Sequence, residues 1–273
     1  MLSSFFIFTQ MKQFKPIGIF DSGVGGTSIW KEIQQLLPQE STIYLADSKN
    51  APYGNKSAQE IIRLSKKNTE KLLEMGCKLI VVACNTATTN AISVLRKTYS
   101  VPFIGIEPAI KPAALKTKTK NIGVLATKGT LSSNLFSKTS EFFSNGINSI
   151  EVVGEGLVPL IEEGRLSDIK TKKLLKQYLL PMMKANIDYL VLGCSHYPYL
   201  IPEIKKIVGN HVTIIDSGEA VARQTKVVLK SLNLATTPSI VAKHLFYSNG
   251  NTVILKELLK DYKEKINIEK LDF

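Results

Sequence analysis

Short apolar runs alternate with longer segments of helical period along most of this chain of 273 residues. The runs are rich in β-branched residues and continuous in apolar character, which is typical of strands buried on both faces of a parallel sheet. The predicted strands are 17–20, 42–46, 79–83, 103–106, 122–126, 150–153, 189–192 and 213–215, and predicted helices include 27–37, 57–75 and one that ends near 98. This alternation predicts an α/β fold with helices flanking mainly parallel sheets.

The chain also resembles itself. The matched segments are Ile17–Ser22 with Ile122–Thr127, Ile80–Asn85 with Leu190–Ser195, and Phe103–Glu107 with Thr213–Asp216, at offsets of 105, 110 and 110 residues. Each segment is a strand followed by polar residues, and the three pairs keep the same order. Because this period is far longer than the ~20–50 residues of a repeat array, the duplication predicts two similar α/β domains.

The composition is that of a packed globular protein. Hydrophobic residues make up 44% of the chain and charged residues 21%, which excludes a disordered or collagen-like chain. No apolar run approaches the ~18–20 residues that a membrane helix needs. Three cysteines cannot close a disulfide framework, which favours a reducing cytoplasm. Residues 1–11 lack the features of a secretory signal, and we expect them to be a disordered extension.

Basic residues are in excess, with 35 Lys and Arg against 23 Asp and Glu and a net charge of +12. The lysines are spread over loops and predicted helices, without the interleaved aromatic residues on which nucleobases stack. Solvated helix faces account for this pattern. A distant alternative is a non-catalytic basic protein that binds nucleic acid.

Polar side chains follow the predicted strands at their carboxyl ends, where open parallel sheets bind ligands. The segments are 21–23, 47–54, 84–86, 127–130 and 194–196. The duplication makes Cys84 and Cys194 equivalent in the two halves. If the halves face each other, one thiol lies on each side of a cleft.

Two opposed thiols suit the inversion of a stereocentre, which needs a base on one face of a carbon and an acid on the other. A cysteine with an unperturbed pKa near ~8.5 forms a thiolate at pH 7 at a cost of only about 2 kcal/mol. We expect Cys84 and Cys194 to lie at helix starts, where the helix dipole favours a thiolate. Asp21 is placed to assist Cys84, and His196 to assist Cys194.

Other interpretations of these residues fit less well. Cys84, Cys194 and His196 are soft metal ligands, but their spacing matches no structural zinc motif, so we expect no metal. The glycines of the segment 23–26 do not match the dinucleotide pattern G-x-G-x-x-G, and no Walker lysine follows.

Six motifs, taken in order, resemble those of the glutamate racemase family. They are F-D-S-G-V-G-G at 20–26, A-P-Y-G at 51–54, A-C-N-T-A-T at 83–88, A-T-K-G-T at 126–130, P-L-I-E-E-G at 159–164 and G-C-S-H-Y-P at 193–198. The resemblance covers about residues 17–222. It implies an isomerase that makes D-glutamate for peptidoglycan without pyridoxal phosphate or any other cofactor. It also implies two α/β domains, related by a pseudo-twofold axis, with the active site in the cleft between them.

The same resemblance implies roles for individual residues. Cys84 corresponds to the thiol that acts on the α-proton of the D-enantiomer, and Cys194 to the thiol that acts on the L-enantiomer. Asp21, Glu162 and His196 correspond to assisting acid–base groups. The implied substrate-binding residues are Asp21, Ser22, Pro52, Tyr53, Gly54, Cys84, Asn85, Thr86, Thr127, Thr130, Cys194, Ser195 and His196.

The chain departs from the family's usual motifs at two places. The family's G-C-T-H-Y-P is G-C-S-H-Y-P here, which keeps a hydroxyl at Ser195, and its A-C-P before Pro159 is replaced by Val153–Glu155. The second departure is expected to alter the wall near Glu162, which has another glutamate, Glu163, beside it in the sequence.

In this family the chain crosses between its domains twice. The resemblance therefore implies a first domain of residues 12–108 and 217–273 and a second of 109–216. The implied partner is glutamate, with no nucleic acid or membrane, and many relatives are homodimers. The alternative within the superfamily is a racemase of aspartate or a related acid, because one methylene in a substrate is worth only ~1–3 kcal/mol of discrimination.

Overall fold

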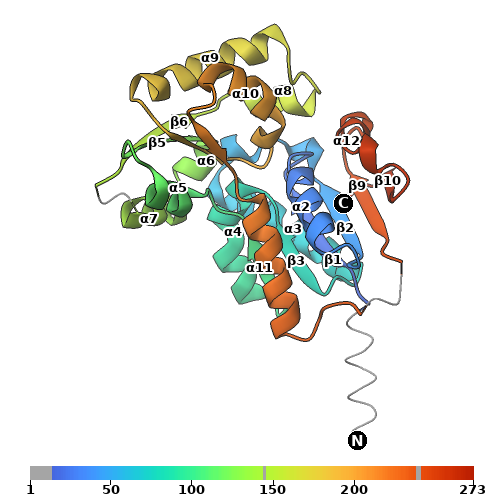
Figure 1. Cartoon of the computed structure of the whole chain (residues 1–273). Coiled ribbons are helices and arrows are strands. Elements are labelled where there is room, and N and C mark those ends of the chain that lie inside the picture. The colour runs from blue at the N-terminus through green and yellow to red at the C-terminus, as the bar shows by residue number, and fades with distance from the viewer. Residues whose placement is uncertain (1–13, 144–145, 238–240) are drawn as a thin grey trace, which may run out of the picture.

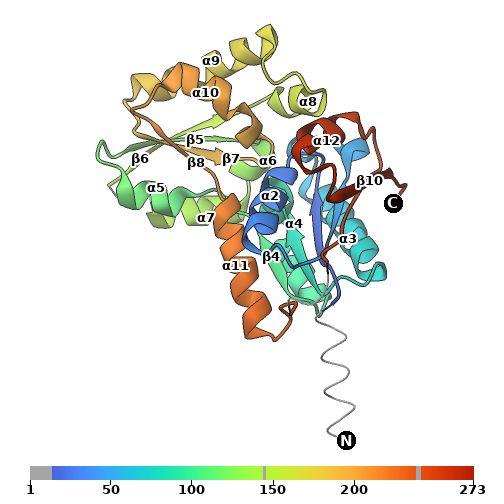
Figure 2. The ribbon, with the colours of Figure 1, turned by 45° about the vertical axis from the view of Figure 1, so that its right-hand side comes forward.

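The structure, a computed structural model, describes residues 14–143, 146–237 and 241–273. Two parallel sheets, each flanked by helices on both faces, make up the chain (Figures 1 and 2). The predicted fold class is confirmed. The extension expected at residues 1–11 lies outside the described residues. Among the helices of the described ranges, none is both long and apolar enough to cross a membrane.

The larger sheet has the parallel strand order β10-β9-β2-β1-β3-β4. Its strands are β1 (Ile17–Asp21), β2 (Thr42–Ala46), β3 (Leu79–Val82), β4 (Phe103–Gly105), β9 (His244–Ser248) and β10 (Ile266–Lys270). Helices α3 (Ala58–Glu74) and α4 (Asn85–Thr98) cover one face, and α2 (Thr27–Leu36), α11 (Gly218–Ser231) and α12 (Val253–Leu258) cover the other. Successive residues of β1 serve the two faces in turn, with Ile19 packed towards α2 and Phe20 towards α3 and α4.

The smaller sheet has the parallel order β6-β5-β7-β8. Its strands are β5 (Asn121–Ala126), β6 (Asn148–Val153), β7 (Tyr189–Gly193) and β8 (Thr213–Ile215). Helices α5 (Ile110–Lys116) and α7 (Asn134–Phe143) lie on one face. Helices α8 (Leu157–Glu162), α9 (Ile169–Lys184) and α10 (Ile201–Val208) lie on the other, and the short α6 (Lys128–Leu131) follows β5.

The order β2-β1-β3-β4 recurs as β6-β5-β7-β8, so each pair of similar segments holds the same place in its sheet. The larger sheet is extended by β9 and β10, which return from the end of the chain. These two strands are not among those predicted from the sequence. In β9 buried and half-buried side chains alternate, and β10 is a largely exposed edge strand, so neither shows the continuous apolar run of a central strand.

Local sequence explains the helix boundaries near the site. Helix α2 ends before Pro38, which cannot donate a helical hydrogen bond. Ser57 caps α3 by accepting a hydrogen bond from the N–H of Glu60 at 3.2 Å, and Gly76, with φ of +81°, follows its end. These boundaries keep the loop that carries Pro52, Tyr53 and Gly54 at the carboxyl end of β2.

Candidate active site

Both cysteines of the sequence prediction line one cavity, which lies at the carboxyl ends of strands from the two sheets. Its walls are Ser22, Pro52, Tyr53, Gly54, Cys84, Asn85, Thr86, Thr127, Val158, Cys194, Ser195 and His196. Of the predicted substrate-binding residues, only Asp21 and Thr130 are absent from these walls, and both contact residues that form them. Val158 is not among the residues predicted from the sequence, because an apolar residue within a helix carries no chemical signal. The free volume is about 10 Å³, roughly enough for one water molecule, so the cavity is narrow.

Cys84 is the N-cap of α4, as expected for a thiol at a helix start. Its Sγ accepts a hydrogen bond from the N–H of Ala87 at 3.4 Å and lies 3.6 Å from the hydroxyl of Ser22. Burial raises the pKa of the Cys84 thiol, the carboxylate of Asp21 raises it further, and the contacts with Ala87 and Ser22 only partly oppose this. The expectation of an easily formed thiolate is therefore wrong for the buried Cys84, because desolvation outweighs the helix start. At neutral pH Cys84 is a thiol.

Cys194 follows β7, but the helix expected directly after it is absent. A turn and a short 3₁₀ helix (Tyr197–Leu200) come first, and α10 begins only at Ile201. Pro202 explains the delay, because it has no N–H to bond the carbonyl four residues earlier and is tolerated only in a first helical turn. The Sγ of Cys194 lies 3.8 Å from Nδ1 of His196. Cys194 thus has an imidazole as its partner where Cys84 has a helix N-terminus.

His196 and Glu162 form a buried pair beside Cys194. Nε2 of His196 lies 2.6 Å from Oε1 of Glu162. Burial alone lowers the pKa of His196, but its hydrogen bonds with Cys194 and Glu162 and the charge of Asp21 raise that pKa well above its ordinary value. His196 therefore carries a positive charge that stabilises negative charge on the neighbouring sulfur. The adjacent Glu163 points away and pairs with Arg165 at the surface, at 3.1 Å.

Asp21 is the last residue of β1, and its side chain is fully buried. Its Oδ1 accepts a hydrogen bond from the hydroxyl of Ser195 at 2.9 Å, and its Oδ2 lies 4.0 Å from Nδ1 of His196. Burial raises the pKa of Asp21, although the charge of His196 and the bond from Ser195 oppose it. Asp21 links the β1 side of the cavity to the Cys194 side.

Neutral hydrogen-bonding groups dominate the rest of the cavity. Thr86 Oγ1 lies 2.7 Å from Thr127 Oγ1 and 3.3 Å from Thr130 Oγ1, so hydroxyls from both sheets meet. The side-chain amide of Asn85 is buried, and within the described residues neither its nitrogen nor its oxygen has a hydrogen-bond partner. Leaving such a group unpaired costs about 1–3 kcal/mol. A polar ligand in the cavity would relieve that cost.

Two glycines allow the β1–α2 loop to approach the second half of the site. A Cβ at Gly23 would lie 2.0 Å from Oε1 of Glu162, and a Cβ at Gly25 would lie 2.2 Å from Nδ1 of His196. In this close approach the N–H of Val24 donates to Oε1 of Glu162 at 2.7 Å. The glycines of the first motif therefore serve contact between the two halves.

The departure at Val153–Glu155 lies in a second hollow, of about 220 Å³, which shares Pro52, Gly54, Thr127 and Val158 with the cavity. Gly154 packs against Tyr197, whose hydroxyl donates to the Gly154 carbonyl at 3.0 Å, and a Cβ at Gly154 would lie 2.3 Å from that hydroxyl oxygen. This segment thus borders the mouth of the cavity.

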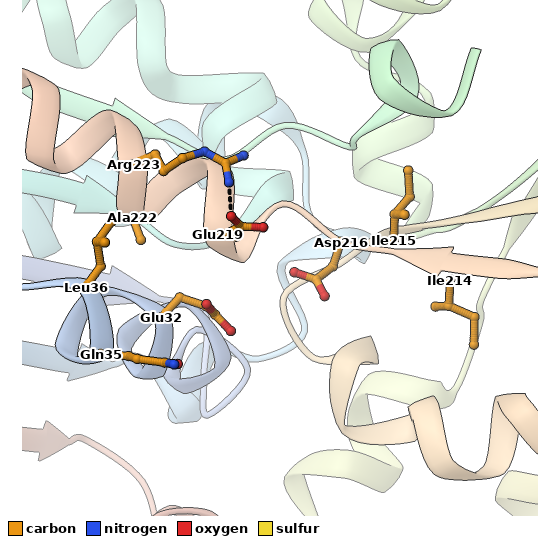
Figure 3. Close-up of a pocket in the computed structure, with 9 residues that line it drawn as sticks. All are labelled: Glu32, Gln35, Leu36, Ile214, Ile215, Asp216, Glu219, Ala222 and Arg223. Carbon is orange, nitrogen blue, oxygen red and sulfur yellow. Dashed lines mark hydrogen bonds and ion pairs between the residues drawn. The ribbon is translucent and has the colours of Figure 1, made fainter. Parts of the chain in front are cut away.

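A larger hollow, of about 690 Å³, lies between α2, the end of β8 and α11 (Figure 3). Three carboxylates face it, those of Glu32, Asp216 and Glu219, and Glu219 pairs with Arg223. Burial raises the pKa of Glu32, and the charges of Asp216 and Glu219 add to the effect. The hollow contains none of the predicted site residues, so its size does not make it the candidate site. Across the described part of the chain, no three His, Cys, Asp or Glu side chains gather as a metal site.

Comparison with known proteins identifies the relatives of this chain. The Asp/Glu/hydantoin racemase family model matches residues 17–225. The chain is 45% identical over 243 residues to a glutamate racemase of Cupriavidus pinatubonensis, and the match covers 89% of each protein.

Solved structures agree with this assignment. A glutamate racemase isoform from Bacillus anthracis has a TM-score of 0.85 and 33% identity, and the match covers 96% of this chain and 98% of that one. Escherichia coli glutamate racemase, in complex with L-glutamate and the activator UDP-MurNAc-Ala, has a TM-score of 0.81 and 32% identity over 94% of this chain and 98% of its own. This chain therefore belongs to the glutamate racemases of the Asp/Glu/hydantoin racemase family.

Proposed function

We propose that this protein interconverts L-glutamate and D-glutamate by proton transfer at the α-carbon, with Cys84 and Cys194 as the acid and base and with no cofactor. One observation carries the proposal: two cysteines at equivalent positions in two similar sheets line the same narrow cavity. The relatives, which are glutamate racemases, support glutamate as the substrate.

The burial that keeps Cys84 a thiol and the imidazole beside Cys194 favour one starting direction. With L-glutamate bound, Cys194 as thiolate removes the α-proton and leaves a carbanion, and His196 stabilises the thiolate before the transfer. Cys84, held as a thiol by burial, then delivers its proton to the opposite face of the carbon and yields D-glutamate. The enzyme is left with a thiol at Cys194 and a thiolate at Cys84. From that state D-glutamate reacts by the same steps in reverse.

The cavity suits a small dicarboxylic amino acid held by neutral donors. Neither Lys nor Arg is among the residues that line it. The carboxylates would instead accept hydrogen bonds from the amide of Asn85, from Ser and Thr hydroxyls and from the N-terminus of α4. The α-ammonium would lie near the acidic groups Asp21 and Glu162.

Glutamate binding requires the cavity to widen between the two sheets, because its free volume of about 10 Å³ is far smaller than glutamate. The contacts that would open are those that cross between the sheets, such as Thr86 with Thr127 and Ser195 with Asp21. Closure around glutamate would then exclude water from the carbanion.

We further propose the domain boundaries 12–108 with 217–273 and 109–216. The strands of the larger sheet, which come from 17–105 and 244–270, and those of the smaller, from 121–215, support this division. A cytoplasmic location, a homodimer and the absence of nucleic-acid and membrane partners stay predictions. Supply of D-glutamate for peptidoglycan is supported by the muramic-acid nucleotide that activates the Escherichia coli relative.

The test is an assay of the purified chain with each enantiomer of glutamate and of aspartate, without added cofactor, followed by circular dichroism. We expect both glutamate enantiomers to racemise and, in D₂O, the product to carry deuterium at the α-carbon. Turnover of aspartate alone would assign the site to the other acid. Absence of turnover together with salt-dependent DNA binding would favour the nucleic-acid alternative.

A further inference from the structure

The carboxylate of Glu162 is held by groups from both parts of the chain. Its Oε1 faces Nε2 of His196 at 2.6 Å and accepts the N–H of Val24 at 2.7 Å. Its Oε2 accepts a hydrogen bond from the hydroxyl of Ser48 at 3.0 Å. Ser48 follows β2 in the larger sheet, whereas Glu162 ends α8 on the smaller sheet. The contact therefore spans the two sheets.

The turn that carries Ser48 is itself held by the returning end of the chain. Asn249, directly after β9, accepts a hydrogen bond from the N–H of Lys49 at 3.0 Å and donates one to the buried carboxylate of Asp47. Gly250 packs so closely that a Cβ there would lie 2.9 Å from the Cβ of Ser48. The position of the Ser48 hydroxyl is thus set by β9 and not by the turn alone.

A carboxylate can rotate about its own axis unless both oxygens are held. With Oε2 fixed by Ser48, Oε1 stays directed at His196, and the ring of His196 stays directed at Cys194. Cys84 has separate partners, Ser22 and the N–H of Ala87. Disturbance at Ser48 reaches Cys194 through three successive contacts, whereas the hydrogen-bond partners of Cys84, Ser22 and the N–H of Ala87, lie outside this series.

We propose that Ser48 is a positioning residue which, through Glu162 and His196, supports proton transfer at Cys194 and leaves the proton transfer at Cys84 unaffected. This inference rests on the proposed function. It also gives β9, an extension with no counterpart in the smaller sheet, a part in aligning one side of the site.

Ser48→Ala removes the hydroxyl and should lower kcat/KM on the order of tenfold, the usual effect of losing one hydrogen bond to a charged group. The loss must be equal in both directions, because the two enantiomers have equal free energies in solution. The isotope effects separate the two thiols. With α-deuterated L-glutamate the deuterium isotope effect on kcat/KM should be larger in the variant than in the wild type, because removal of the deuteron by Cys194 becomes more rate-limiting. With α-deuterated D-glutamate the isotope effect should be smaller in the variant, because the later step, protonation by Cys194, now limits the rate.

Two comparisons show that the effect belongs to the hydroxyl and passes through Glu162. Ser48→Thr should keep wild-type kinetics. Ser48→Val, which has the shape of threonine without the hydroxyl, should behave like Ser48→Ala. This pair keeps the test valid if the alanine variant folds poorly. In a Glu162→Gln background, Ser48→Ala should cost less than about twofold. The exposed Ser93 on α4 offers a matched control, and Ser93→Ala should leave both isotope effects unchanged.

Isotope effects that move together, or an equal loss in the wild-type and Glu162→Gln backgrounds, would overturn the role of Ser48. So would full activity of the Val variant. These results differ from failure of the proposed function, which would appear as a wild-type protein that does not racemise glutamate at all.

Discussion

Cys84 and Cys194 follow equivalent strands, yet the structure surrounds them differently. Cys84 caps a helix of 14 residues and has a hydroxyl and a backbone N–H as partners, and burial raises its pKa. Cys194 precedes a turn and faces His196, which Glu162 supports. Duplication places the two sulfurs at equivalent points, whereas their neighbours differ in chemistry. Cys84 is a thiol held protonated by burial, and Cys194 has the charged imidazole of His196 beside it.

Replacement of either cysteine should have the largest effect on activity and tests whether the two thiols have different roles. Cys84→Ala and Cys194→Ala should each lower racemisation by about 10²–10⁴-fold or more, because each direction needs both an acid and a base. The two variants should differ in exchange of the α-proton with D₂O, measured by NMR. Cys194→Ala should retain exchange only with D-glutamate, and Cys84→Ala only with L-glutamate. Exchange of both enantiomers by one variant would show that a single thiol serves both faces.

A smaller change should damage only the Cys194 side. Gly25→Ala would place a methyl group 2.2 Å from Nδ1 of His196, so the ring must move away from Cys194. A misplacement of about 1 Å can cost about 10²-fold in rate, and we expect a loss in kcat of that order. Exchange of D-glutamate, which depends on Cys84, should persist. If exchange of both enantiomers falls equally, His196 is not specific to one thiol.

Chemical labelling compares the thiols directly. Cys84 and Cys194 are similarly buried, at 4% and 6% exposure, so access alone does not separate them. Because burial raises the pKa of Cys84, iodoacetamide should modify Cys194 about tenfold or more faster at neutral pH, as measured by mass spectrometry of the peptides. The rate at Cys84 should climb with pH through the alkaline range. Equal modification rates at neutral pH would show that the thiols of Cys84 and Cys194 do not differ in reactivity.

The charge on His196 should also make the free energy of unfolding depend on pH. This is the smallest effect that we predict. The pKa of His196 is raised in the folded state. Its charge therefore contributes fully to the free energy of unfolding below about pH 6.5, the ordinary pKa, and the contribution is lost as pH rises through the folded-state pKa. The difference in free energy of unfolding between the wild type and His196→Gln should therefore shrink from neutral to alkaline pH. Urea unfolding at several pH values measures it. A difference that does not change with pH would mean that folding leaves the pKa of His196 at its ordinary value.

Much of the site could be predicted because its residues follow strands. The rule that ligands bind at the carboxyl ends of parallel strands is enough, with the amino-acid sequence alone, to select both cysteines, Ser195 and Thr127. The same rule includes Ser48, which follows β2, but a serine in a polar segment gives no sign of what it will contact. Strands β9 and β10 were missed because half-exposed edge strands lack a continuous apolar run.

By itself the amino-acid sequence determined the two α/β halves, their internal similarity and the presence of a thiol at the same point of each half. These follow from patterns along the chain, namely apolar runs, helix breaks and repeated motifs. Only the tertiary structure decided that Glu162 faces His196 while Glu163 faces solvent, that Cys84 is protonated, and that β9 holds the turn of Ser48. Desolvation and charge depend on which groups surround an atom in space, and some of those groups come from segments more than 100 residues apart.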